Sequence, residues 1–264
     1  MTDAEKYLFD VLGFVVLEDV LSPDELNQLN QLIDRQTLEA PRADDGPFFF
    51  GTSNEDSPTG LLDWGKPFCD LLDHPKAMEA LEWMIGVGPR IEQVSGVHAC
   101  EGSKGQSLHA ASHTHYDFRN GRVFAGLTVV SWNLSDGGGA FGGFCCIPGS
   151  HKVNYTYPVP VEEYPYPIPP PIEDGYEDAD FLMVPKVKAG SVLIFTEALT
   201  HGSVSWKASY ERRSLLYKYG SRTQQHVSPP MTAPTSMKLT DSQRFCFEPP
   251  GTRPLEQIPR RTGN

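Results

Sequence analysis

Two histidines and an aspartate fall within the six residues HTHYDF, at positions 113 to 118. Imidazole and carboxylate groups are common ligands of transition metals. On an extended segment the side chains alternate between two faces, so His115 and Asp117 would share one face while Tyr116 points the other way. This pair would supply two neighbouring ligands of a metal ion, and a third ligand would have to come from elsewhere in the chain.

Two other histidines compete with this pair. His109 and His113 precede it, but the combination of His113 with His115 would lack a carboxylate. Both are interpreted more simply as surface residues or as residues behind the ligands. Because the chain holds eight histidines, a single His-x-Asp pair can arise by chance. The second half of the sequence must therefore support it.

That support comes from KAGSVLIFTEALTHGS, which predicts a glycine turn, an apolar strand and then His201 beyond the strand's end. Two histidines and one carboxylate form the facial arrangement that binds Fe(II) and leaves coordination positions open. Arg212 follows eleven residues later, at the start of the strand in YERRSLLYKYG. A hairpin would bring its guanidinium near the metal, where it could bind a carboxylate through two hydrogen bonds. Arg213 is the alternative, and strand alternation allows only one of the two to face inward.

The N-terminal part predicts helices. AEKYLFDVLG has helical spacing and stops at Gly13, and FVVLEDV then predicts a short strand. LSPDELNQLNQLIDRQ predicts a second helix, in which Ser22 is the cap, Pro23 lies in the first turn and Glu25 completes a capping box. PKAMEALEWMIG predicts a third helix, which ends at Gly86.

From about residue 88 the pattern changes to short β-rich runs: RVFAGLTVVSWNL, GGFCCI, GSVLIF and RRSLLYKYGS. Strands that follow a few helices predict a mainly β domain of the α+β class, a barrel or sandwich with helices packed outside it. The 264 residues fit one domain, with a helical part at about 1–87, a β core at about 88–221 and an irregular tail at 222–264. Residues 154–180, rich in Pro, Tyr and acids, form either a surface excursion or a lid.

The charge balance narrows the class of partner. Lys and Arg number 22 and Asp and Glu 34, which gives a formal net charge of −12. Such a surface repels nucleic acid and anionic membranes, although a local basic pocket could still accept an anion. The five cysteines form no CxxC pair, the opening residues do not resemble a signal peptide, and no apolar run approaches the ~18 residues that span a bilayer. We therefore expect a cytoplasmic protein with free thiols that acts on a small molecule.

Several motifs occur together in one order: HYD, WNLSDGGGAFGGFCCIPGSHK, GSVLIFTEALTHGS and RRSLLYKY. They resemble the phytanoyl-CoA dioxygenase family of Fe(II)/2-oxoglutarate-dependent oxygenases. The N-terminal LGFVVLEDVLSPDEL is similar to that family's opening, so the resemblance covers roughly residues 7 to 221. IPGSHK and THGS are its more specific motifs, and the bare His-x-Asp is its least specific one.

The resemblance implies a double-stranded β-helix, a cupin-like jelly roll, with flanking helices. It implies that His115, Asp117 and His201 bind Fe(II), and that Arg212 holds the distal carboxylate of the co-substrate 2-oxoglutarate. Asp117 fills a position that some relatives in the wider superfamily leave to a halide. Hydroxylation or a related oxidation is therefore expected rather than halogenation.

Other positions have two interpretations. Ser203 and Trp132 match residues that line the co-substrate pocket in relatives, and the alternatives are a turn hydroxyl and a core aromatic. His151, in IPGSHK, is interpreted as structural, after a turn formed by Pro148 and Gly149. The glycine-rich 136–143 lacks the Gly-Lys-Ser/Thr ending of a phosphate-binding loop and is interpreted as a connection near the barrel mouth.

The sequence thus predicts an Fe(II)- and 2-oxoglutarate-dependent dioxygenase. It would use O2 to hydroxylate or otherwise oxidise a C–H bond of a small-molecule substrate, with release of succinate and CO2. Two alternatives stay open: a cupin-like metal enzyme that does not use 2-oxoglutarate, and a non-catalytic protein that binds a metal or a ligand. The substrate and the oligomeric state cannot be inferred from the sequence.

Overall fold

A computed structural model describes residues 1–111, 114–153 and 181–251. The Pro-, Tyr- and acid-rich segment 154–180, expected to be either a surface excursion or a lid, lies outside the described residues. The helices are α1 (Asp3–Leu12), α2 (Pro23–Asp34), α3 (Lys66–Asp70), α4 (Pro75–Ile85) and α5 (Asp241–Phe245), with short 3-10 turns at Gly60–Trp64, Leu71–Asp73, Gly139–Phe141 and Ser150–Lys152. The strands are β1 (Phe14–Leu17), β2 (Phe48–Phe50), β3 (Arg90–Ala99), β4 (Gln106–His109), β5 (Asp117–Arg119), β6 (Arg122–Phe124), β7 (Thr128–Asn133), β8 (Gly143–Cys146), β9 (Val192–Thr196), β10 (His201–Val204) and β11 (Arg212–Gly220).

The predicted N-terminal helices are confirmed together with their end signals. Helix α1 stops at Gly13, whose φ of 83° is a left-handed conformation that favours glycine. Helix α2 has the full capping box, because Ser22 accepts from the Glu25 backbone while the Glu25 side chain accepts from the Ser22 backbone. Helix α4 ends before Gly86, as predicted. The residues at the ends of these helices are therefore sufficient to determine where the helices begin and end.

The strands form two main antiparallel sheets. The larger has the order β1-β9-β7-β11-β3-β2, and the smaller has the order β4-β10-β8. Strands β1 and β2, from the part of the chain expected to be helical, are the two edges of the larger sheet. The N-terminal part therefore supplies both the covering helices and the edges of the sheet.

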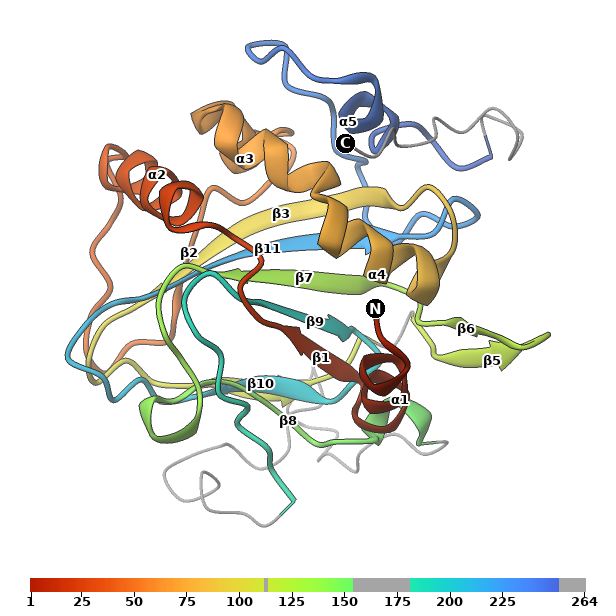
Figure 1. Cartoon of the computed structure of the whole chain (residues 1–264). Coiled ribbons are helices and arrows are strands. Elements are labelled where there is room, and N and C mark those ends of the chain that lie inside the picture. The colour runs from red at the N-terminus through yellow and green to blue at the C-terminus, as the bar shows by residue number, and fades with distance from the viewer. Residues whose placement is uncertain (112–113, 154–180, 252–264) are drawn as a thin grey trace.

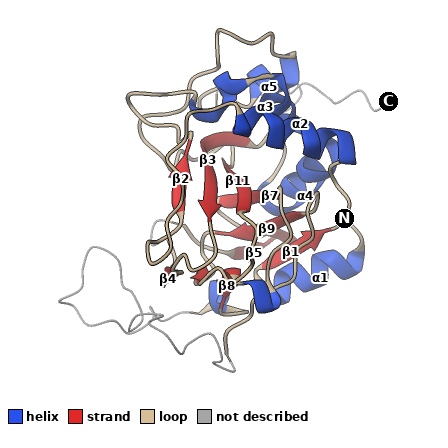
Figure 2. Cartoon of the chain, turned by 90° about the vertical axis from the view of Figure 1, so that its left-hand side faces the viewer, coloured by secondary structure: helices blue, strands red, loops and turns tan. Residues whose placement is uncertain are grey.

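Helices α2, α3 and α4 lie along one face of the larger sheet, and the smaller sheet lies on its other side (Figures 1 and 2). The main core forms under these helices: Leu29, Leu81 and Met84 pack in one cluster with Leu215 and Tyr217 of β11. Burial of a large apolar side chain contributes about 1.5–3 kcal/mol each, so this layer holds the larger sheet in place. The mainly β, α+β expectation is confirmed.

Alternation along each strand of the larger sheet separates the two faces. On β7, Val130 and Trp132 belong to the core under the helices, while Val129 and Ser131 face the smaller sheet. Because consecutive side chains point to opposite faces, one strand serves a packed core and a cavity at once. Two facing antiparallel sheets with helices on the outer face are the architecture of a double-stranded β-helix.

The sequence did not predict every element, and one that it missed bears on the site. Strands β5 and β6 form a separate two-stranded hairpin, joined by Asn120 and Gly121, both with positive φ (53° and 75°). Asn-Gly with this backbone is the preferred two-residue hairpin turn. The run RVFAGLTVVSWNL is therefore two strands, β6 and β7, rather than one. The hairpin begins at Asp117, the second residue of the predicted His-x-Asp pair, and His115 lies just before it.

Candidate active site

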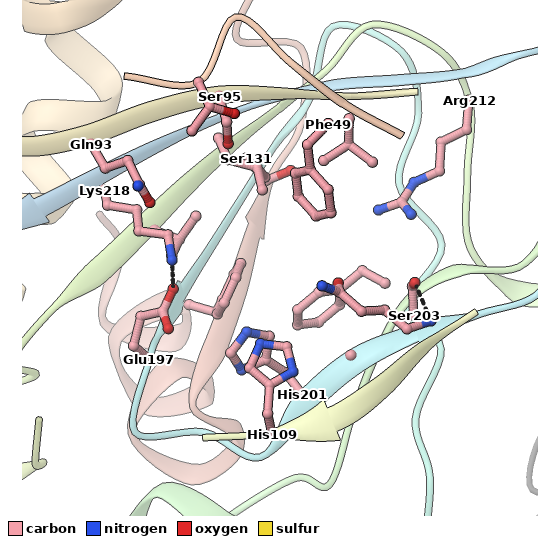
Figure 3. A pocket seen from close by; sticks show the side chains of 18 residues that line it. Phe49, Gln93, Ser95, His109, Ser131, Glu197, His201, Ser203, Arg212 and Lys218 are labelled. Atoms are coloured by element: carbon pink, nitrogen blue, oxygen red, sulfur yellow. Dashed lines mark hydrogen bonds and ion pairs between the residues drawn. The ribbon is translucent and has the colours of Figure 1, made fainter. Parts of the chain in front are cut away.

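The two sheets enclose a cavity of about 290 Å3 (Figure 3). Strands β3, β7 and β11 form one wall, and β4, β8 and β10 form the other. Its aromatic lining comes from Phe49, Phe144 and Phe195. Its polar lining residues are Thr52, Gln93, Ser95, Gln106, His109, Ser131, Glu197, His201, Ser203, Arg212 and Lys218.

Two of the lining residues, His109 and His201, stand directly opposite each other. They are partners in the antiparallel register of β4 and β10, and their ring centroids lie 4.4 Å apart. His201 lies beyond the end of β9 (Val192–Thr196), as expected, and is itself the first residue of β10. Burial and the neighbouring His109 lower the pKa of His201 to about 4, so this imidazole is neutral near pH 7.

Both imidazoles are oriented in the same way. Nδ1 of His201 donates to the Leu199 carbonyl oxygen at 2.7 Å, and Nδ1 of His109 donates to the Ser107 carbonyl oxygen at 2.9 Å. Since a carbonyl only accepts, each Nδ1 carries the proton of this hydrogen bond, and in the neutral His201 ring the lone pair is therefore on Nε2. Among the described residues neither Nε2 has a hydrogen-bond partner. A backbone carbonyl behind one ring nitrogen is the usual support of a metal-binding histidine.

Glu197 is the single acidic side chain on the described lining of this cavity. It follows β9, and its Oε1 lies 2.8 Å from Nζ of Lys218. Burial alone would raise the pKa of this carboxyl, but Lys218 and His201 outweigh burial and lower the pKa to about 2. The sequence reasoning missed Glu197, although it lies four residues before His201 in FTEALTH.

Arg212 reaches the same cavity from β11 and lies across it from the two histidines (Figure 3). Burial lowers the pKa of its guanidinium to about 10, so it stays charged at pH 7. No carboxylate within the described part of the chain pairs with it. Arg213 points away, where it pairs with Asp34 at 2.6 Å and Glu211 at 2.8 Å.

The connection from His201 to Arg212 is not the expected hairpin. Strand β10 belongs to the smaller sheet and β11 to the larger one, so the connection between His201 and Arg212 crosses from one sheet to the other. The two residues therefore face each other across the cavity instead of lying side by side. Together with Lys218, Arg212 makes the cavity locally basic in a chain of net charge −12.

The structure places the two expected pocket residues differently. Ser203 lines the cavity, and its hydroxyl accepts from the Gln106 backbone N–H at 3.0 Å. Trp132 does not line it: its indole is fully buried on the other face of β7, against His74 and Tyr217. Strand alternation gives the reason, because the adjacent Ser131 faces the cavity.

His115 and Asp117 are close together but lie in a different place. Nε2 of His115 is 3.2 Å from Oδ2 of Asp117, and the same carboxylate oxygen pairs with Arg119. They line a second cavity of about 250 Å3, which shares no lining residue with the first. The His115 side chain is 62% exposed, whereas His201 is 6% exposed.

Tyr116 explains this orientation. Its hydroxyl donates to Asp10 of α1 at 2.5 Å, and its ring packs on Phe9 and edge-on against His151 at 4.6 Å. Because Tyr116 is held inward against α1, its two neighbours must face outward. His151 itself is buried, with Nε2 3.1 Å from the Asp10 carbonyl oxygen, which agrees with the structural role expected for it.

Within the described residues, no three His, Cys, Asp or Glu side chains are close enough together to hold one metal ion. The types of donor in the first cavity nevertheless suit iron and an anionic co-substrate: imidazoles whose Nε2 atoms have no hydrogen-bond partner among the described residues, one carboxylate, and a guanidinium without an anionic partner there. His201, Arg212 and Ser203 meet there. His115 and Asp117 do not join them, and their role as ligands stays a prediction.

Comparisons with known proteins agree with this architecture. The family model described as phytanoyl-CoA dioxygenase (PhyH) matches residues 9–214. No curated protein matches the sequence significantly. No helix in the described ranges is both long and apolar enough to cross a bilayer.

Solved structures resemble the chain in fold. HygX from Streptomyces hygroscopicus, with nickel and 2-oxoglutarate bound, aligns with a TM-score of 0.67 at 20% identity and covers 84% of this chain and 87% of its own. The epimerase SnoN, in complex with Fe3+, alpha-ketoglutarate and nogalamycin RO, aligns with a TM-score of 0.62 at 16% identity, over 99% and 96% of the two chains. The carbocyclase SnoK from nogalamycin biosynthesis aligns with a TM-score of 0.61 at 12% identity, over 88% and 93%.

The family match covers well over half of the sequence, and both the helix-covered double sheet and the order of the motifs agree with it. The expected double-stranded β-helix is confirmed. The chain belongs to the phytanoyl-CoA dioxygenase family of Fe(II)- and 2-oxoglutarate-dependent enzymes.

Proposed function

We propose that this enzyme oxidises, and most simply hydroxylates, a C–H bond of a small-molecule substrate inside the first cavity. The observation that carries the proposal is the guanidinium of Arg212, which has no anionic partner in the described residues and lies across the cavity from two facing imidazoles. Bound iron and 2-oxoglutarate would supply the oxidation by O2, with succinate and CO2 as the products of the co-substrate.

The chain's own residues would bind and orient these groups. Arg212 would hold the distal carboxylate of 2-oxoglutarate through two charge-assisted hydrogen bonds. His201 would be an iron ligand. From the sequence its partners would be His115 and Asp117. Phe144 and Phe195 pack around His201, at ring distances of 6.0 and 4.6 Å, and would exclude water from that side.

The substrate is proposed to be small and polar. Gln93, Ser95 and Ser131 on the wall of the larger sheet offer hydrogen bonds to hydroxyl or carbonyl groups (Figure 3). The volume of about 290 Å3 must hold the co-substrate as well, which excludes a bulky substrate from full entry. Relatives in fold have been solved with hygromycin B and nogalamycin RO, which supports a small-molecule substrate for this chain.

The test has two stages. Anaerobic addition of Fe(II) and 2-oxoglutarate should produce the weak visible charge-transfer band of the chelate, and O2 should then yield succinate. Small polar compounds are next screened for stimulation of succinate release over the uncoupled rate. If neither the band nor any O2-dependent succinate is observed, the proposal is contradicted. The protein would then be either a metal enzyme that does not use 2-oxoglutarate or a non-catalytic protein that binds a metal or a ligand.

Mass spectrometry of the product then identifies the reaction. Hydroxylation under 18O2 adds one labelled oxygen atom, cyclisation or desaturation removes two hydrogens, and epimerisation leaves the mass unchanged. We expect the labelled oxygen. An unlabelled product of lower mass would indicate desaturation or cyclisation instead of hydroxylation, and one of equal mass would indicate epimerisation.

A further inference from the structure

Strand β11 carries two cationic side chains, Arg212 and Lys218, that both line the first cavity. They are six residues apart, which on an extended strand is about 20 Å between the two Cα atoms. The two side chains accordingly stand at opposite ends of the cavity (Figure 3). 2-Oxoglutarate is much shorter than this distance, so its proposed binding by Arg212 leaves the end around Lys218 to the prime substrate.

The wall that leads to this end is polar. Gln93 of β3 is the register partner of Lys218, and its side-chain amide has no hydrogen-bond partner among the described residues. In the next row of the sheet, Leu216 stands between Ser95 of β3 and Ser131 of β7. Both serines are buried, at 5% and 6% exposure, and their hydroxyl groups also have no partner in the described part of the chain. Because buried polar groups normally have partners, this wall suits a polar ligand.

An ion pair closes the same end. Nζ of Lys218 lies 2.8 Å from Oε1 of Glu197, and both side chains line the cavity. The pair uses one of the three N–H donors of the ammonium group and one of the two carboxylate oxygens. Neither group has a second residue as a partner within the described ranges. The pair therefore offers a positive and a negative hydrogen-bonding group next to each other.

The charges of the pair discriminate between ligands. A simple anion would be attracted by Lys218 but repelled by Glu197, and the opposite holds for a simple cation. A molecule with an ammonium and a carboxylate group gains from both: its ammonium donates to Glu197, and its carboxylate accepts from Lys218. The amide of Gln93 can donate to the carboxylate as well.

We propose that Gln93, Glu197 and Lys218 form the recognition subsite of the prime substrate, and that this substrate is a small zwitterion of the amino-acid class. The proposal rests on the proposed function, because it leaves the opposite end of the cavity to 2-oxoglutarate. The rest of the substrate would lie along Ser95 and Ser131. A cavity of about 290 Å3 that also holds the co-substrate favours a free amino acid over a peptide.

The experiment measures binding by calorimetry to the full-length protein loaded with Fe(II) and 2-oxoglutarate, without O2, so that no turnover occurs. The probes are the protein amino acids and, for each one that binds, the carboxylic acid without its amino group and the amine without its carboxylate. Both analogues are smaller than the amino acid, so size excludes neither.

We expect at least one amino acid to bind, and each of its analogues to bind roughly 10- to 100-fold more weakly, which is the contribution of a hydrogen bond to a charged group. Absence of binding by every amino acid would overturn the proposal. An analogue that binds as tightly as its amino acid would do the same.

Two variants should change the charge preference in opposite directions. Lys218→Met leaves the carboxylate of Glu197 alone, so the amino acid should bind roughly 10-fold more weakly and the amine more tightly than in the wild type. Glu197→Gln leaves the ammonium of Lys218 alone, so the amino acid should again bind more weakly but the carboxylic acid more tightly. A purely structural role would weaken all three probes together, and that result would overturn the proposal. Lys188→Met, which breaks an exposed ion pair with Glu18, is the matched control and should bind all probes as the wild type does.

Gln93→Met keeps the ion pair, so it tests the subsite even if the two charge variants fold poorly. It should weaken amino-acid binding by roughly 3- to 10-fold, the contribution of a neutral hydrogen bond. Its affinity for 2-oxoglutarate should stay within roughly twofold of the wild type, because Arg212 holds the co-substrate at the other end. Thermal melts verify that each variant is folded. Unchanged amino-acid affinity, or an equal loss of affinity for 2-oxoglutarate, would overturn the subsite.

Failure of this subsite is distinguishable from failure of the proposed function. A protein that binds an amino acid with these charge preferences but forms no succinate under O2 keeps the subsite and loses the oxygenase chemistry. A protein that forms succinate but binds no amino acid keeps the chemistry and loses the subsite.

Discussion

Arg212 and Arg213 are neighbours on β11, yet their guanidinium groups lie on opposite faces of the larger sheet. Arg212 faces the cavity and has no anionic partner among the described residues, whereas Arg213 is paired with Asp34 and Glu211. This difference offers a direct test, since the two side chains have the same chemistry and adjacent positions.

Arg212→Ala is expected to raise the KM for 2-oxoglutarate by roughly 100-fold, because a two-pronged charged hydrogen bond contributes about 3 kcal/mol. Arg213→Ala should leave that KM unchanged and lower the melting temperature slightly. Succinate formation against co-substrate concentration gives both values. Equal kinetics in Arg212→Ala and the wild type would argue for an enzyme that does not use 2-oxoglutarate.

Gly202→Ala is expected to lower the free energy of unfolding by about 1–3 kcal/mol, the usual cost of overpacking. A methyl group there would lie 2.5 Å from the Gln106 carbonyl oxygen and 2.8 Å from that of Ser107, which forces β10 away from β4. The same displacement would also separate His109 of β4 from His201 of β10. Gly137→Ala is the control, since its methyl would meet only the Trp206 ring at 3.8 Å. Urea denaturation measures both, and equal stabilities would show that the strands can separate without cost.

Lys218→Met is expected to destabilise the metal-free protein by about 2–3 kcal/mol, because it leaves the buried Glu197 carboxylate without a cation. The value is below that of a fully buried pair because the Lys218 side chain keeps 24% exposure. Adding Glu197→Gln should recover part of the loss. A double-mutant cycle by urea denaturation gives the coupling, and a coupling of zero would mean that the ion pair does not stabilise the fold.

His151 gives a pH dependence of stability. Burial lowers its pKa from 6.5 to about 4 in the folded protein. Between these values the unfolded state binds more protons, so the free energy of unfolding falls as the pH drops from 6.5 towards 4, by up to about 3 kcal/mol. His151→Gln should show a shallower decline over this window in urea titrations at several pH values. Parallel curves for the variant and the wild type would contradict the assignment of the slope to His151.

Signals within a few residues determined much of this protein. Ser22 and Glu25 form a capping box whatever the rest of the chain does, and Gly13 and Gly86 end their helices by backbone preference. The period of two in RRSLLYKY separates Arg212 from Arg213. The same period in VVSWNL puts Ser131 and Trp132 on different faces. These features depend on local geometry, so the sequence alone was sufficient for them.

Only the tertiary structure decided which face of β7 bounds the cavity and which packs under the helices. It makes Trp132 the core aromatic, one of the two interpretations that the sequence left open. The pairing of His109 with His201 also depends on the register between two strands that are distant in the chain, and no local pattern encodes it. Likewise, Tyr116 turns His115 and Asp117 outward because it packs on α1, more than a hundred residues earlier. The residue types in HTHYDF indicated a metal enzyme, but long-range packing decided which histidines face the cavity.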